Sequence, residues 1–145
     1  MPPEEIAFCL VTGLAGRLYL SGHLNRMSVE ELALVREGVV AYEGLRADLA
    51  QAVPFWPLGL PTSLDAVVVL GLRSPAATHL YVWFPQPGEH PAVSLPLPVG
   101  VEGGAVETVY PRSLPAYEQE WEAADRVLRV TPTVSGPTAR VLRLG

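Results

Sequence analysis

Cysteine and basic residues are scarce in this chain of 145 residues, and lysine is absent. Cys9 is the only cysteine, so the chain forms no internal disulfide and has no cysteine cluster that binds zinc. The ten basic residues are all arginine, and fifteen acidic residues leave a net charge of −5. Nucleic acids and anionic membrane surfaces require a basic face. We therefore expect neither as a partner.

Long apolar runs are also missing. No stretch reaches the roughly 18 uncharged apolar residues that are needed to cross a bilayer. Residues 1–5 include two glutamates, whereas a secretory signal peptide begins with a basic region. The sequence therefore predicts a cytoplasmic protein with no membrane partner.

Motifs for cofactors and metals are absent as well. Residues 13–16 (Gly-Leu-Ala-Gly) lack the preceding strand and the following lysine of a phosphate-binding loop. His23, His79 and His90 are isolated from one another and from carboxylates at metal-ligand spacing. We expect no cofactor and no metal site. His23 keeps one functional alternative, because it follows a predicted strand end, where catalytic groups gather in α/β folds.

Apolar residues, in contrast, make up 49% of the chain, enough for the core of one ordinary domain. The 15 prolines and 13 glycines are above the usual share. Because they are spread between apolar runs, they indicate the turns of a folded sheet rather than a disordered segment.

Helical patterns occupy the first third of the chain. Residues 2–13 are predicted to form a short helix that begins with prolines and glutamates and ends at a glycine. Residues 16–22 are predicted to form a short strand. Ser28 and Glu31 form a capping box, so a long helix should begin here and continue to about residue 52. The apolar stripe of this helix consists of Leu32, Val35, Val39, Tyr42, Leu45 and Leu49.

The helical spacing of apolar residues ends at a segment with three prolines, Pro54, Pro57 and Pro61. Each proline lacks a backbone N–H and disfavours a helical conformation for the residue before it, so the helix should end by about Val53. Phe55 and Trp56 lie in this stiff segment. We expect these two aromatic side chains to fill the seam between the helix and a sheet.

Beyond this junction, apolar runs alternate with turn residues. The predicted strands cover residues 66–72, 78–84, 92–98, 106–111, 125–131 and 138–144. Short strands joined by polar turns are typical of an antiparallel sandwich. The predicted fold class is therefore α+β: a short helix, a strand and a long helix, followed by an antiparallel β-sandwich-like C-terminal domain.

Aromatic residues near carboxylates favour one binding function. Tyr117 and Trp121 lie in a segment with three glutamates, and such a composition is typical of a solvated face. Exposed aromatic rings can also stack on a sugar while carboxylates bind its hydroxyl groups. In this alternative, the chain is a free-standing β-sandwich that binds a glycan through Tyr81, Trp83 or Trp121. These side chains would then have to be exposed together on one face.

Several ordered segments carry a family resemblance. They are residues 16–24 (Gly-Arg-Leu-Tyr-Leu-Ser-Gly-His-Leu), the capped helix through residues 42–46 (Tyr-Glu-Gly-Leu-Arg), residues 54–59 (Pro-Phe-Trp-Pro-Leu-Gly) and residues 138–142 (Thr-Ala-Arg-Val-Leu). Together they resemble the C-terminal part of family 36 glycoside hydrolases, the bacterial α-galactosidases. The resemblance covers nearly the whole chain and is stronger before residue 61 than after it.

This resemblance implies a domain organisation. Such enzymes contain a large N-terminal β-sandwich, a central (β/α)8 barrel and a small C-terminal antiparallel β domain. Residues 1–61 would then be the end of the catalytic barrel, with residues 14–22 as its eighth strand and residues 28–53 as its final helix. Residues 62–145 would be the C-terminal β domain.

The family's catalytic residues are not found in this chain. The resemblance implies a retaining mechanism in which two aspartates on earlier barrel strands act as nucleophile and acid/base. Asp48, Asp65 and Asp125 are the only aspartates here, and none lies in a segment that resembles those motifs. One βα unit also cannot close a barrel around a pocket. We therefore expect that the chain alone hydrolyses nothing, whereas the parent enzyme would cleave terminal α-galactosides.

The sequence thus predicts a structural piece of a glycoside hydrolase. Its partners would be the rest of the parent's barrel and the N-terminal domain, and its contact with carbohydrate would be through the parent. His23, Trp83 and Trp121 are the candidates for substrate contact. Without the other barrel strands, the long helix would expose its apolar stripe, so the chain should either form a homo-oligomer or pack this helix on its own sheet.

Overall fold

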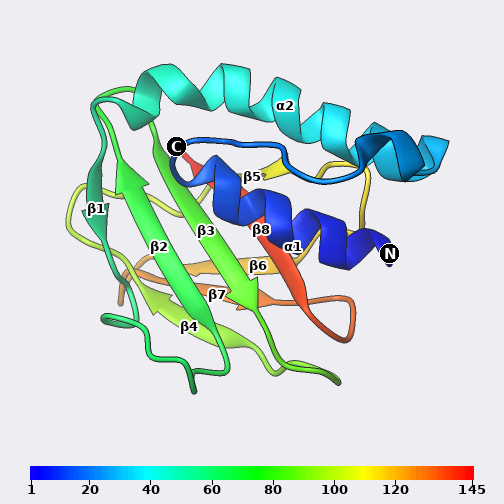
Figure 1. Cartoon of the computed structure of the whole chain (residues 1–145). Coiled ribbons are helices and arrows are strands. Elements are labelled where there is room, and N and C mark those ends of the chain that lie inside the picture. The colour runs from blue at the N-terminus through cyan, green and yellow to red at the C-terminus, as the bar shows by residue number, and fades with distance from the viewer.

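The computed structural model describes residues 1–145, the whole chain, as two α-helices followed by eight strands (Figure 1). Helix α1 spans Pro3–Leu14 and helix α2 spans Val29–Leu49, with the 3-10 turn η1 (Leu24–Arg26) between them. The strands are β1 (Val53–Phe55), β2 (Val68–Arg73), β3 (Thr78–Phe84), β4 (Val93–Pro96), β5 (Val106–Tyr110), β6 (Glu118–Glu122), β7 (Val127–Thr131) and β8 (Thr138–Leu144). Neither helix has the length and apolar composition of a membrane span.

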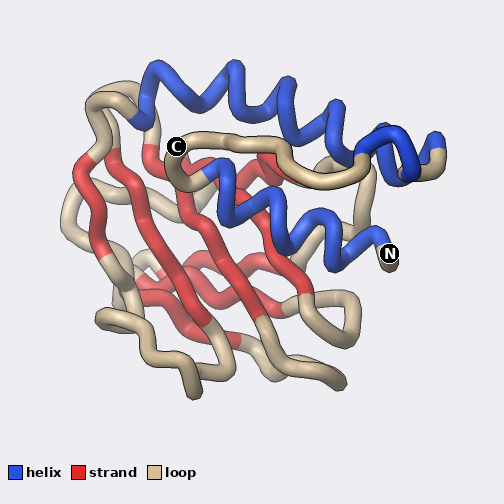
Figure 2. The backbone as a smooth tube through the Cα atoms, in the orientation of Figure 1, coloured by secondary structure: helices blue, strands red, loops and turns tan.

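The strands form two antiparallel sheets. The larger sheet has the order β1-β2-β3-β8-β5, and the smaller sheet has the order β4-β7-β6. Both helices cover one face of the larger sheet, while the smaller sheet lies beyond its other face (Figures 1 and 2). The α+β fold class predicted from the sequence, helices with a β-sandwich-like domain, is therefore confirmed.

Strand β3 shows why the larger sheet has an apolar core on each side. Successive side chains of a strand point to opposite faces. Tyr81 and Trp83 belong to the core beneath the helices, whereas Leu80, Val82 and Phe84 belong to the core between the sheets. Such a strand, buried on both faces, carries a continuous apolar run rather than an alternating one.

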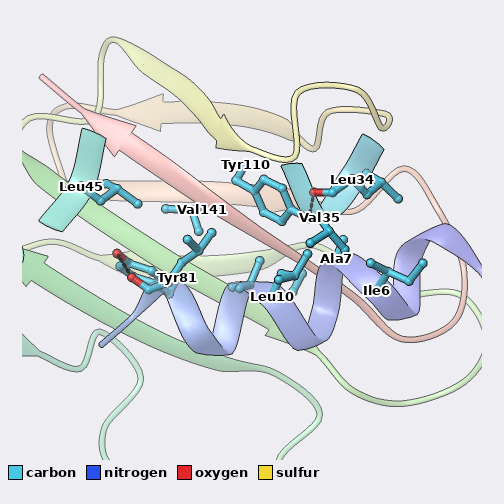
Figure 3. Packing of buried hydrophobic residues seen from close by; sticks show 12 residues of the cluster. Ile6, Ala7, Leu10, Leu34, Val35, Leu45, Tyr81, Tyr110 and Val141 are labelled. Carbon is cyan, nitrogen blue, oxygen red and sulfur yellow. Dashed lines mark hydrogen bonds between the residues drawn. The ribbon is translucent and has the colours of Figure 1, made fainter. Parts of the chain in front are cut away.

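The core beneath the helices joins the first and last parts of the chain (Figure 3). Ile6 and Leu10 of α1 and Val35 of α2 pack with Tyr81 of β3 and Val141 of β8. Of the two outcomes expected for the long helix, packing on the chain's own sheet is the one observed. Residues 1–61 and 62–145 thus contribute to one shared core.

The N-terminus of α2 agrees with the sequence in detail. The Ser28 Oγ accepts a hydrogen bond from the Glu31 N–H at 3.1 Å, and the Glu31 carboxylate accepts one from the Ser28 N–H at 2.8 Å. The predicted capping box is therefore confirmed. The N-terminal amine of Met1 also donates to Glu31, at 2.9 Å, which ties the start of the chain to this helix.

The buried face of α2 is rotated relative to the predicted stripe. Val35 and Leu45 are buried as expected, but Leu34 is also buried, whereas Leu32 is only half-buried. Gly38 accounts for this shift, because its missing side chain lets the ring of Tyr110 approach the helix, with ring atoms 3.5 Å from an added Cβ position. The Tyr110 hydroxyl then donates to the Leu34 carbonyl at 3.0 Å.

The strand predicted for residues 16–22 is wrong, and so is the eighth barrel strand that the resemblance implies for residues 14–22. This segment is irregular and its backbone makes no hydrogen bond in any sheet. A parallel strand requires neighbours that satisfy its N–H and C=O groups. No strand pairs with this segment, so its backbone forms no hydrogen-bonded ladder, although Leu18 and Leu20 have the spacing of one strand face.

The sequence also missed two strands. Strand β1 follows α2 directly and pairs with β2, which places Phe55 opposite Gly71. Pro54 is tolerated there because β1 is an edge strand. Strand β6 lies at the edge of the smaller sheet and contains the solvent-facing run of glutamates around Trp121.

Candidate functional site

A cleft of about 280 Å³ opens between the C-terminal half of α2 and the end of the larger sheet. Its apolar wall includes Val40, Ala41 and Leu45 of α2 and Val109 of β5. Its charged and polar residues are Glu37 and Asp48 of α2, His79 of β3, Glu107 of β5, Arg112 after β5, and Arg143 of β8. We call it the α2–sheet cleft. Four further clefts are lined by fewer charged side chains.

Strand register builds the floor of this cleft. His79 on β3 pairs with Arg143 on β8, which in turn pairs with Glu107 on β5. The three residues therefore form one row across three neighbouring strands, on the face that α2 covers. Directly paired residues have Cβ atoms about 5 Å apart, so these side chains reach one another or a shared ligand.

The outer rim of the cleft is held by its own hydrogen bonds. The Arg112 Nη2 lies 2.6 Å from the Glu107 carboxylate, and the Arg112 Nε donates to the Thr108 carbonyl at 3.1 Å. The Glu37 carboxylate accepts hydrogen bonds from the Arg112 N–H and from the Ser113 hydroxyl and N–H. These contacts fix the loop after β5 against α2. Glu37, Glu107 and Arg112 are thereby engaged within the protein.

The inner part of the cleft is not engaged in this way. His79 is 4% exposed and its ring makes no side-chain hydrogen bond within the protein. Its nitrogens still reach solvent, because the Arg126 Nε is the one fully buried side-chain nitrogen or oxygen without a partner. Burial lowers the pKa of His79, the Asp48 carboxylate opposes this change, and the Arg143 charge adds to it. The ring is therefore neutral at pH 7, with one N–H donor and one acceptor nitrogen. Arg143 takes part in none of the four ion pairs of the protein.

A second charged cluster is buried at the opposite end of β8. Arg140 is fully buried and donates to both Glu4 oxygens at 2.8 Å, to the Pro115 carbonyl and to the Ala139 carbonyl. Thr138 donates to Glu4 at 2.7 Å. Because its polar atoms already have partners in the protein, this cluster is structural, not a binding site.

The histidines named from the sequence lie apart. His23 is exposed and precedes η1, away from the α2–sheet cleft. The His90 Nε2 lies 2.7 Å from the Gly136 carbonyl oxygen, and its ring packs against Phe84 with a centroid distance of 5.1 Å. No group of three histidine, cysteine or acidic side chains is arranged to hold a metal ion. Of the three histidines, the cleft contains only His79.

The aromatic candidates are also separated. Tyr81 is buried and donates to the Leu14 carbonyl at 2.9 Å, while half-buried Trp83 donates from Nε1 to Thr12 at 3.2 Å. Both lie beneath α1. Trp121 belongs to the smaller sheet, and its ring lies 5.9 Å from the Arg126 guanidinium. The three aromatic side chains therefore do not form one exposed platform for a sugar.

The aspartates do not meet either. Asp48 lines the α2–sheet cleft, Asp65 accepts hydrogen bonds from Thr62 in the loop before β2, and Asp125 lies in the turn between β6 and β7. These are three different places in the fold. The three aspartates therefore do not form the carboxylate pair of a retaining glycosidase.

Sequence reasoning treated His79 as an isolated histidine and identified neither it nor its neighbours in the cleft as a site. The alternation along residues 78–84 and 138–144 does put His79 on one face with Tyr81, and Arg143 on one face with Val141. The sequence does not indicate that these two strands pair, because more than fifty residues separate them. Only the register brings His79 and Arg143 together.

We compared the chain with protein-family models, with curated proteins and with solved structures. None of the three comparisons gave a match.

Proposed function

We propose that this chain is the C-terminal piece of an α-galactosidase-like glycoside hydrolase and has a structural role in it. The observation that supports this most is the arrangement of α1, residues 15–27 and α2. The two helices run in the same direction, and the connecting segment runs back between them (Figure 1). In a (β/α)8 barrel, each helix likewise leads into a strand that runs antiparallel to it and is followed by the next helix.

The connecting segment makes no backbone hydrogen bond to a strand of this chain. Residues 17–22 make none of the backbone–backbone hydrogen bonds of the turns and loops, and they belong to no sheet. In a barrel, a strand at this position would bond to one parallel neighbour on each side. The neighbouring strands would come from the rest of the parent enzyme.

Apolar surface around this segment supports the same proposal. Tyr19 is 77% exposed and Leu20 is 43% exposed. Both line a second hollow of about 310 Å³, of which ten of the twelve lining residues are hydrophobic, including Leu18 and Met27. Contiguous exposed apolar surface marks a contact site for another protein or domain. We call this surface the Tyr19 patch.

In this role the chain supplies packing rather than catalytic groups. Its three aspartates are far apart in the fold, so the nucleophile and the acid/base of a retaining mechanism would come from the parent. The substrate class, terminal α-galactosides, is carried by the family resemblance.

The proposal is tested by complementation. A bacterial α-galactosidase that lacks its last βα unit and C-terminal domain is mixed with the whole chain, and hydrolysis of a chromogenic α-galactoside is measured. We expect turnover from the mixture and none from the chain alone. Tyr19→Asp with Leu20→Asp should abolish the recovery, whereas Val99→Asp, at a residue that is 84% exposed outside the patch, should preserve it. Turnover by the chain alone, or recovery that ignores the patch variants, would contradict the proposal.

A further inference from the structure

Strand β6 forms an open edge of the smaller sheet. It pairs with β7 on one side, and no helix or other strand runs along its outer side. The backbone of Glu118–Glu122 makes the hydrogen bonds of the β6–β7 ladder and takes part in none of the backbone bonds of turns and loops. In an edge strand, every second residue points its N–H and C=O groups away from the sheet. These outward groups of β6 are without a partner in the protein.

The other three sheet edges are interrupted. Strand β1 has only three residues and includes Pro54, and β4 includes Pro96, and a proline offers no N–H to a further strand. Strand β5 shifts its register between Thr108 and Tyr110, and the Arg112 side chain already donates to the Thr108 carbonyl. Strand β6, in contrast, has five residues, no proline and a continuous register with β7. Of the four edges, β6 therefore offers the longest uninterrupted strand to a partner.

The side chains of β6 indicate the charge of this partner. Glu118, Glu120 and Glu122 are exposed on one face of the strand, and the two residues between them are half-buried on the other face. None of the three glutamates takes part in an ion pair, and only Glu120 has a cation, Arg129, opposite it in the strand register. Like charges on paired strands repel, and opposite charges attract. Two copies of β6 are therefore disfavoured as partners, whereas a strand with a basic residue at every second position is favoured.

We propose that the outer edge of β6 binds an extended basic segment of another protein, which adds to the smaller sheet as a fourth strand. Backbone hydrogen bonds hold the segment in register, and its alternate arginine or lysine side chains lie beside the glutamates of β6. The net charge of −5 also attracts a basic partner before contact. This inference goes beyond the proposed role in a hydrolase, and β6 shares no residue with the Tyr19 patch.

The test is a titration of the whole ¹⁵N-labelled chain with the peptide acetyl-TRVRVRT-amide, followed by NMR at constant ionic strength. Two further peptides of this sequence carry backbone N-methyl groups, one on its arginines and the other on its valines. In a paired strand, either the arginine or the valine N–H groups face β6, because these groups alternate between the two sides of a strand. We expect saturable shifts at the amides of Glu118–Glu122 with the unmodified peptide and loss of binding for only one of the methylated peptides. Equal binding by the two methylated peptides would show that charge alone attracts the peptide, and it would overturn the proposal.

A charge exchange tests the contribution of the glutamates. Glu118→Arg with Glu122→Arg should weaken binding of the arginine peptide about tenfold and should allow the acidic peptide acetyl-TEVEVET-amide to bind instead. Glu43→Arg with Glu89→Arg is the matched control, because it changes the net charge equally at two exposed residues outside the smaller sheet. This control should bind the arginine peptide as the unchanged chain does. All four glutamates are exposed, so both double variants should fold. Shifts that do not saturate, or equal binding by the two double variants, would contradict the proposal.

Discussion

The guanidinium of Arg140 and the carboxylate of Glu4 form a bidentate ion pair, with Nη1–Oε2 and Nη2–Oε1 distances of 2.8 Å. It joins the first turn of α1 to the last strand, across a separation of 136 residues. Tyr117 completes the cluster, because its ring lies 4.8 Å from the guanidinium and its hydroxyl is 2.9 Å from Thr138. The two ends of the chain are therefore linked by an ion pair in which Arg140 is fully buried and Glu4 is partly buried.

Removing one partner of this pair should be costly. Glu4→Gln leaves the fully buried Arg140 guanidinium without its anion, and we expect the free energy of unfolding to fall by about 3–5 kcal/mol. Arg140→Met should act in the same direction. Urea denaturation followed by circular dichroism measures both changes. Glu5→Gln, one position along in the same helical turn but exposed, is the control and should change stability by less than about 0.5 kcal/mol.

The fit of Phe55 over Gly71 gives a second prediction. A Cβ added at Gly71 would lie 2.2 Å from the Phe55 ring, so Gly71→Ala must displace the ring and β1 with it. We expect a loss of about 1–3 kcal/mol and faster hydrogen exchange in β2, which pairs with β1. Gly44→Ala is the matched control: nothing lies within 4 Å of that Cβ position, and alanine should stabilise α2 by about 0.5–1 kcal/mol. Equal stability of the two variants would show that Phe55 does not cover Gly71.

His79 makes stability depend on pH. Burial lowers the pKa of its ring in the folded chain, so the unfolded chain, with an ordinary histidine pKa of about 6.5, binds the proton more readily. The contribution of His79 is therefore complete above about pH 6.5 and is lost as the pH falls below it towards the folded-state pKa. We expect the urea concentration at the unfolding midpoint to decrease when the pH is lowered from 7.5 to 5.5.

His79→Gln should reduce this pH dependence, since glutamine does not titrate. His23→Gln, at an exposed histidine, should leave it unchanged. If both variants keep the full pH dependence, another group is responsible for it.

The sequence predicted those features that depend on local chemistry. Ser28 and Glu31 cap α2 because the two residues lie three apart in one turn, and the helices and most strands follow from apolar spacing. Strand β1 was missed because three residues interrupted by Pro54 have no strand pattern of their own. The strand prediction for residues 16–22 failed for the opposite reason. This segment has the pattern of a strand, but no strand of this chain pairs with it.

The candidate site was less accessible to sequence reasoning than the fold. His79 looked isolated in the sequence, because its position beside Arg143 depends on which strands pair and in what register. Trp83 and Trp121 were grouped by chemistry, and the fold places them in different layers. A constellation built across strands is specified by tertiary contacts, whereas a capping box is specified by adjacent residues.

The Tyr19 patch should make the isolated chain associate with itself. Exposed Tyr19 and Leu20 bury apolar surface when two copies meet, so the sedimentation coefficient should rise with protein concentration. Tyr19→Asp with Leu20→Asp should remove this dependence. Leu64→Asp, at a leucine that is 89% exposed in the loop before β2, is the control. If Leu64→Asp removes the dependence and the patch variant does not, the contact surface lies elsewhere.

The proposed role as the C-terminal piece of a hydrolase is tested most directly by the size of the protein in its own cells. An antibody raised against this chain is used on an immunoblot of lysate from the source organism. We predict one band several times larger than the 15.6 kDa of the chain. A single band at 15.6 kDa would mean that the cell uses this piece alone, and it would contradict the proposal.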